Sequence, residues 1–149
     1  MREILFRGKK KETGEWIEGS LVLDKFKDLE ACIRDFGREY HFVDPETVGQ
    51  YIGLTDNGGK RIFEGDIIEI SETGYTPQTI LGKVIYHGNA FKIWTMCEYY
   101  EKGLFYDFKT EDKFDEGHAI ITLKRKFFVI GNIYDHANIK LEIIEERRR

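Results

Sequence analysis

The amino-acid sequence predicts a mainly β fold, either a barrel or a sandwich, with one or two short helices. An SH3-like barrel is one form of this class. Aromatic residues make up 14% of the chain, and its 11 Phe and 8 Tyr favour pleated sheets. Short apolar segments alternate with turn residues, and only two prolines occur. The length suits one domain, so we expect residues 1–149 to fold as a single domain.

The N-terminal segment predicts a β-hairpin. Residues 2–7 begin an extended apolar segment, residues 9–14 are polar and typical of a turn, and residues 16–23 resume the extended pattern. Two consecutive strands joined by a short turn usually pair with each other.

Residues 24–37 interrupt this pattern and predict a helix. Their larger apolar residues recur three or four positions apart, on one helical face: Phe26, Leu29, Ile33 and Phe36. Asp24 is a suitable N-cap, and Gly37 is a suitable residue after the last turn. Strands are the alternative for this segment. Farther along, residues 44–46 combine a capping residue with a proline and predict one short helical or 3₁₀ turn.

Residues 50–68 predict a hairpin with a glycine-rich turn. Residues 57–59 (Asn-Gly-Gly) can adopt the positive φ values that hairpin turns need. We therefore expect residues 51–54 to pair with residues 61–70. The run superficially resembles a phosphate-binding loop, but it lies between two strands and lacks the required spacing.

Two further segments follow this hairpin. Residues 82–86 and 90–95 predict a strand pair joined by a short turn. Residues 99–117 are aromatic and acidic without clear periodicity, so we expect a long surface excursion there.

The last part of the chain predicts two more strands. They span residues 119–123 and 127–134, on either side of a basic turn at residues 124–126. Residues 139–144 predict a strand or a short helix.

The charge distribution argues against bulk electrostatic attraction to nucleic acid. The net charge is −4, whereas phosphate contacts need a basic face. Residues 1–11 hold five basic residues and one acid, and residues 98–116 hold seven acids and three lysines. These runs are either solvated faces or complementary contacts between subunits.

The sequence predicts a cytoplasmic protein without a membrane span, cofactor or metal site. No apolar run approaches the roughly 18 residues of a membrane helix. Cys32 and Cys97 are far apart and lack a CxxC partner, so we expect two free, buried thiols. The four histidines share no metal-ligand spacing with each other or with the cysteines.

Three segments, taken in order, resemble the YopX-like proteins of phages and prophages. They are residues 2–7 (REILFR), residues 44–68 (DPETVGQYIGLTDNGGKRIFEGDII) and residues 129–135 (VIGNIYD). The resemblance implies a β-dominated single YopX-like domain, a phage or prophage origin and assembly into homo-oligomers. It implies no known reaction and therefore no catalytic residues. The family often continues with a proline-containing turn, whereas this chain has residues 136–138 (His-Ala-Asn) there.

Within these segments we single out nine residues as family-motif positions with a structural or binding role. They are Gly53, Leu54, Asp56, Gly58, Glu64, Gly65, Asp66, Gly131 and Asn132. Glu64 and Asp66 are two positions apart, which would place both carboxylates on one face of a strand. Such a pair could serve acid–base chemistry or hold a hard cation. A structural role is the alternative, with Gly65 permitting a bulge and Asp66 bonding backbone amides.

Aromatic residues in the second half of the chain have acidic neighbours. The neighbours disfavour nucleobase stacking and favour core packing or a protein interface. These aromatic residues are Trp94, Tyr99, Tyr100, Phe105, Tyr106 and Phe108.

Three function hypotheses follow. The first is a non-enzymatic phage protein that works by self-assembly and by binding another molecule, such as an unidentified protein. The second is a small β-barrel module that binds nucleic acid through the basic residues 9–11 and 124–126. The third is a metal-dependent enzyme that uses Glu64 and Asp66.

Overall fold

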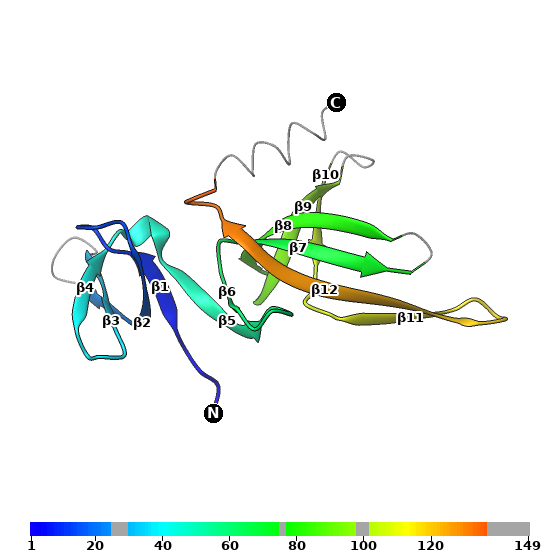
Figure 1. Cartoon of the computed structure of the whole chain (residues 1–149), viewed down its shortest axis with the longest axis horizontal. Helices are drawn as coiled ribbons and strands as arrows, with labels where there is room; N and C mark the ends of the chain where they lie inside the picture. Colours follow the sequence, from blue (N-terminus) through cyan, green and yellow to red (C-terminus); the bar gives the residue numbers. More distant parts are fainter. Residues whose placement is uncertain (25–29, 75–76, 98–101, 137–149) are drawn as a thin grey trace. The chain divides into compact units, whose positions relative to one another are not determined.

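The computed structural model describes residues 1–24, 30–74, 77–97 and 102–136, which form two six-stranded sheets and one short 3₁₀ helix (Figure 1). The predicted mainly β fold is confirmed. The first sheet has the order β4-β3-β2-β1-β5-β6. Its strands are β1 (Phe6–Lys9), β2 (Trp16–Asp24), β3 (Glu30–Arg34), β4 (Tyr40–Val43), β5 (Gly49–Thr55) and β6 (Arg61–Phe63).

The second sheet has the order β10-β9-β8-β7-β12-β11, and its described pairings are antiparallel. Its strands are β7 (Asp66–Thr73), β8 (Gln78–His87), β9 (Ala90–Cys97), β10 (Lys102–Tyr106), β11 (Glu111–Asp115) and β12 (Ile120–Asn132). The chain divides into two compact units, residues 1–54 with 61–64 and residues 55–60 with 65–149. The single domain predicted over residues 1–149 stays a prediction.

The core of the first unit is built from alternating residues of neighbouring strands. Ala31, Ile33 and Val43 are buried together, while Cys32 between the first two is half-buried. A bridge between Lys10 and Val43 connects the outer strand β4 back to the end of β1. The first sheet therefore curls onto itself, as a barrel does.

The predicted helix over residues 24–37 is wrong where the structure describes it. Asp24 ends β2, residues 30–34 form β3, and Gly37 lies in the turn before β4. Phe36 is 68% exposed, so the apolar spacing of three and four does not mark a buried face. The burial alternates with period two, which is the pattern of a strand. Phe26 and Leu29 lie outside the described residues.

Two other sequence predictions are confirmed in the first unit. β1 and β2 form the N-terminal hairpin in the register Phe6 to Gly19 through Lys9 to Trp16. The 3₁₀ helix η1 (Pro45–Thr47) begins after Asp44, whose Oδ1 accepts the Glu46 N–H at 3.1 Å.

The core of the second unit includes buried side chains on four strands, among them Ile68, Ile70, Val84, Ile93 and Phe127. β12 pairs with β7 through residues 124–132 and with β11 through residues 120–124. β11 and the start of β12 therefore continue beyond the end of β7 as a two-stranded ribbon (Figure 1). The predicted hairpin of residues 82–95 is confirmed as β8 and β9.

Two expectations for the second unit are wrong. The sequence predicts a long surface excursion over residues 99–117, but residues 102–106 and 111–115 form the strands β10 and β11. The sequence predicts two strands, residues 119–123 and 127–134, around a basic turn, but residues 120–132 form the single strand β12, with an irregularity between Val129 and Gly131. The prediction for residues 139–144 falls outside the described residues.

Candidate functional site

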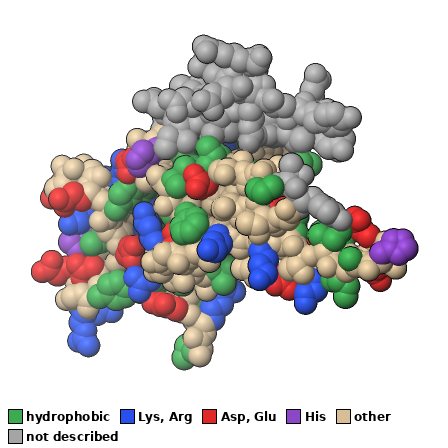
Figure 2. All heavy atoms as spheres, turned by 45° about the vertical axis from the view of Figure 1, so that its right-hand side comes forward, with side chains coloured by type: hydrophobic (Ala, Val, Ile, Leu, Met, Phe, Trp, Pro, Cys, Tyr) green, Lys and Arg blue, Asp and Glu red, His purple; other side chains and the backbone are tan. Residues whose placement is uncertain are grey.

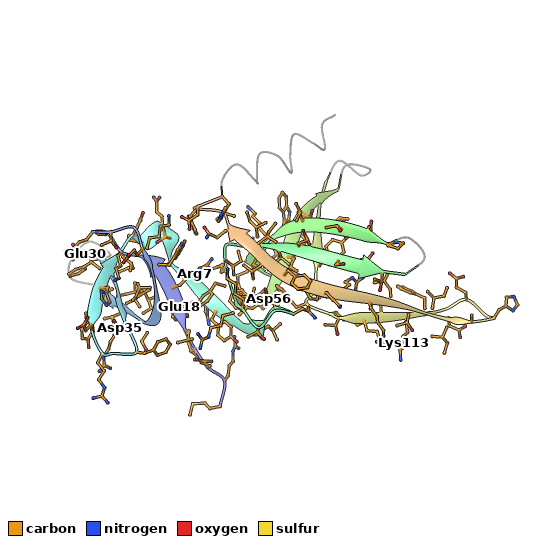
Figure 3. The ribbon with its side chains drawn as sticks, viewed as in Figure 1. Arg7, Glu18, Glu30, Asp35, Asp56 and Lys113 are labelled. Atoms are coloured by element: carbon orange, nitrogen blue, oxygen red, sulfur yellow. The ribbon has the colours of Figure 1, made fainter. Side chains whose placement is uncertain are left out.

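The predicted hairpin turn between β5 and β6 is held by the carboxylate of Asp56 (Figure 3). Its Oδ1 accepts the N–H groups of Gly58 at 2.9 Å and Lys60 at 2.8 Å. Its Oδ2 accepts the N–H of Val129 on β12 at 2.9 Å. Asp56 is 9% exposed. Burial acts to raise its pKa, but these three backbone N–H groups outweigh burial and hold the pKa below its ordinary value.

Asn57 extends the same attachment to β12. The Asn57 N–H donates to the carbonyl of Phe127 at 2.9 Å, and the Phe127 N–H donates to Asn57 Oδ1 at 2.8 Å. The turn thus occupies the edge of β12 beyond the residues that pair with β11. These bonds satisfy backbone groups that a sheet edge would otherwise leave open.

Gly65 and Asp66 lie where β7 begins. Gly65 has a φ of 88°, a conformation that favours glycine. Its N–H donates to the carbonyl of Val84, and its carbonyl accepts the N–H of Ile133, both at 2.9 Å. Asp66 is 1% exposed and is the cross-strand partner of Asn132. Three family-motif positions therefore meet at this end of the second sheet.

Gly131 and Asn132 shape the turn that follows β12. The Asn132 Oδ1 accepts the N–H groups of Tyr134 at 3.0 Å and Asp135 at 2.9 Å. A Cβ at Gly131 would lie 2.6 Å from Nδ1 of His136, so only glycine fits there without a shift. Asn132 therefore has the backbone-bonding role that Asn commonly has in turns.

Glu64 and Asp66 do not lie on one strand, so the predicted pairing on one strand face is wrong. β6 ends at Phe63 and β7 begins at Asp66, with a turn at residues 64–65. Burial raises the pKa of Glu64, and a backbone hydrogen bond from Gln50 only partly offsets it. The expected pairing of residues 51–54 is confirmed for β6 alone, because β7 joins the second sheet.

The remaining motif positions lie in or beside the β5–β6 hairpin. Gly53 has a φ of 88°, and a Cβ there would meet no atom within 4 Å. Leu54 is 46% exposed. Gly58 contributes its N–H to Asp56, and the positive φ of the turn falls on Gly59 at 85°.

One cluster of metal-ligating residues in the described segments was missed by sequence reasoning. Ligand atoms of Asp35, Glu39 and His41 in the first unit lie within 4.8 Å of one another. His41 Nε2 lies 2.8 Å from Asp35 Oδ2, and the Glu39 N–H donates to Asp35 Oδ1 at 2.9 Å. The hydrogen bond from His41 is the main cause that lowers the pKa of Asp35. These contacts close the turn between β3 and β4, and this turn brings the three residues together.

The model of a protein family described as "YopX protein" matches residues 5–139. The match covers most of the chain and extends over both units. The chain belongs to the YopX family. A comparison with curated proteins gives no match. In residues 1–24, 30–74, 77–97 and 102–136, no helix of this YopX chain has the length and apolar character needed to cross a bilayer.

The first unit of the YopX chain has an exposed apolar face on β2, β3 and β4. Val22 and Phe42 lie on either side of Cys32 as its cross-strand partners, and Tyr40 lies two positions from Phe42. These four residues form what we call the apolar face. Val22 is 43% exposed, Phe42 58% and Tyr40 63%. Cys32 is a free thiol, as predicted, but it is half-buried rather than buried.

The second unit contains a groove of about 350 Å³ at the two-stranded ribbon. Its lining includes Glu72, Phe114 and Leu123. Beside it, Arg125 binds Glu72 Oε2 through Nε at 2.8 Å and Asp112 Oδ2 through Nη1 at 2.6 Å. Arg125, the central residue of the basic cluster 124–126, therefore forms ion pairs with two carboxylates of its own unit.

Proposed function

We propose that this YopX-family chain is a non-enzymatic binding protein that self-assembles through the apolar face of its first unit. The observation that carries the proposal is the row Val22–Cys32–Phe42, which presents apolar side chains to solvent across three strands. Contiguous exposed apolar patches commonly mark interaction sites. In a two-fold symmetric dimer the same surface of both copies packs together, so the apolar face of a second copy can cover that of the first.

The geometry of the family-motif residues supports a role without catalysis. Both carboxylate oxygens of Asp56 accept backbone N–H groups. Glu64 and Asp66 lack the shared strand face that the sequence predicted for a pair of carboxylates. The side chains of Asp56 and Asn132 accept backbone N–H groups and stabilise turns, which is a structural role.

Light scattering over a range of protein concentrations tests self-assembly. We expect an oligomer for the wild-type chain and a shift toward the monomer for Phe42→Lys, since a buried ammonium would lack a partner in the interface. Ile4→Lys is the matched control, because Ile4 is 62% exposed and lies outside the apolar face. A wild-type chain that stays monomeric at every concentration contradicts the proposal.

Cys32 offers a second measurement of the same interface. In a Cys97→Ser background, mild oxidation should link Cys32 of one copy to Cys32 of another if the two apolar faces pack together. Burial raises the pKa of the Cys32 thiol, so the reaction is run at alkaline pH to form the thiolate. Phe42→Lys should abolish the covalent dimer, and Ile4→Lys should leave it.

The proposal includes a phage or prophage origin and a cytoplasmic location. The family membership supports the origin. The genes next to the coding sequence test it, because a prophage protein lies among other phage genes.

A further inference from the structure

Strands β8, β9 and β10 present a row of three aligned side chains on one face of the second sheet. Lys83 is the cross-strand partner of Trp94, and Trp94 is the partner of Phe105. Directly opposite residues of an antiparallel sheet point to the same face. His87 and Lys92 alternate onto this face as well. We call these five residues the aromatic face.

The rings of the aromatic face are held flat. The ring of His87 stacks on that of Phe105 with a centroid distance of 4.2 Å and an interplanar angle of 9°. A Cβ at Gly103 would lie 2.2 Å from Nε1 of Trp94, so the indole lies against the backbone of β10. Phe105 remains 43% exposed and His87 is also exposed.

Positive charge accompanies these rings although the whole chain carries −4. Lys83 Nζ lies 5.2 Å from the centroid of the Trp94 ring. Lys92 is half-buried, and its Nζ lies 3.4 Å from Oδ1 of the exposed Asp107. This carboxylate neutralises part of the positive charge. In the view of Figure 2, basic, acidic and hydrophobic side chains interleave over the visible surface. Because Asp107 neutralises part of the charge at the aromatic face, binding there depends on stacking as well as on charge.

We propose that the aromatic face binds single-stranded nucleic acid. Bases stack on the Phe105–His87 pair, and phosphates lie beside Lys83 and Lys92. Parallel exposed rings beside lysines are the combination by which single-strand binders hold bases of any sequence. A base adds to a stack through its flat face, which the parallel rings of His87 and Phe105 already provide. This inference rests on the proposed role in binding and is independent of self-assembly.

The test measures the fluorescence anisotropy of labelled oligo-dT and oligo-U at low salt with the full chain. Phe105→Leu keeps apolar bulk but removes the ring, and we expect it to weaken binding about tenfold. Phe114→Leu is the matched control, because Phe114 is 51% exposed and lines the groove with Glu72 on the opposite face. Lys83→Gln should reduce the slope of log affinity against log salt by about 0.7.

Three outcomes would overturn the inference. They are no binding of either oligonucleotide at low salt, equal binding of an abasic oligonucleotide, and equal losses for Phe105→Leu and Phe114→Leu. If a proline-rich peptide binds and neither oligonucleotide does, the partner of the aromatic face is a protein and not a nucleic acid. Light scattering of Phe105→Leu separates the two proposals, since its oligomer should persist while its oligonucleotide binding falls.

Discussion

Replacing Asp56 should cost the second unit much of its stability. Its carboxylate accepts three backbone N–H groups at 2.8–2.9 Å, one of them from a strand 73 positions away. Hydrogen bonds to a charged group contribute about 1.5–3 kcal/mol each, and they are not additive within one turn. We therefore expect Asp56→Ala to lower the free energy of unfolding by about 4 kcal/mol. Asp56→Asn keeps one acceptor but turns an amide donor toward Val129, so about 2 kcal/mol is expected.

Urea unfolding followed by the fluorescence of Trp94, in a Trp16→Phe background, reports on the second unit. Asp115→Ala is the control, because the exposed Asp115 accepts one N–H, from Gly117 at 2.8 Å, and closes only its own turn. We expect that control to cost under about 1 kcal/mol. Equal midpoints for Asp56→Ala and Asp115→Ala would refute the argument that the bond to β12 matters.

The pH dependence gives a second readout of the same contact. The pKa of Asp56 is lower in the folded chain than its ordinary value. Its contribution is therefore complete above the unfolded pKa of about 3.9 and is lost as the pH falls through the folded value. The stability difference between wild type and Asp56→Asn should stay constant above about pH 5 and shrink below about pH 4. A difference that persists at low pH would contradict the role of the charged form.

Three further predictions concern other motif and core residues. Burial raises the pKa of Glu64, so Glu64→Gln should raise the urea midpoint of the first unit at neutral pH, with no gain below about pH 4. Gly65→Ala and Gly53→Ala should each lower the free energy of unfolding by about 1–2 kcal/mol, because both positions have a positive φ. Gly65→Ala should have the larger effect, since a Cβ at residue 65 would lie 3.2 Å from a side chain, whereas a Cβ at residue 53 would meet no atom within 4 Å. Arg125→Met should lower the free energy of unfolding by about 3 kcal/mol, because it removes the positive charge beside the buried Glu72 and leaves that carboxylate with the neutral amide of Gln78 at 2.6 Å. Adding Glu72→Gln in a double-mutant cycle should recover most of that loss.

The strands predicted correctly are those whose partner follows directly along the chain. The hairpin of β8 and β9 has apolar segments on both sides of a turn of two residues, so the local pattern is sufficient. β11 was missed because four of its five residues are charged, which is typical of a solvated loop and equally of a protected sheet edge. The continuous β12 was missed because Arg125 looked like part of a turn. Its carboxylate partners, 53 and 13 positions away, have no local signature.

The same limit applies to the candidate site. The sequence indicates that Asp56 belongs to a turn, because Asp and Asn favour turns. It contains no sign that the second oxygen of Asp56 reaches Val129. Glu64 and Asp66 looked like a pair because a strand was assumed to continue through Gly65. The φ of 88° at Gly65 ends that strand and sends the chain into the second sheet.

The family segments and the proposed binding surfaces are separate sets of residues. Residues 44–68 and 129–135 hold the β5–β6 turn and the start of β7 to β12, through backbone-bonding side chains that are already engaged. Phe42 and Phe105, which carry the apolar and aromatic faces, lie outside those segments. A sequence that keeps these segments can therefore change what it binds without changing how it folds, since function depends on sites carried by a fold. Family membership consequently predicts the architecture of this chain, whereas its partners must be sought on the two faces.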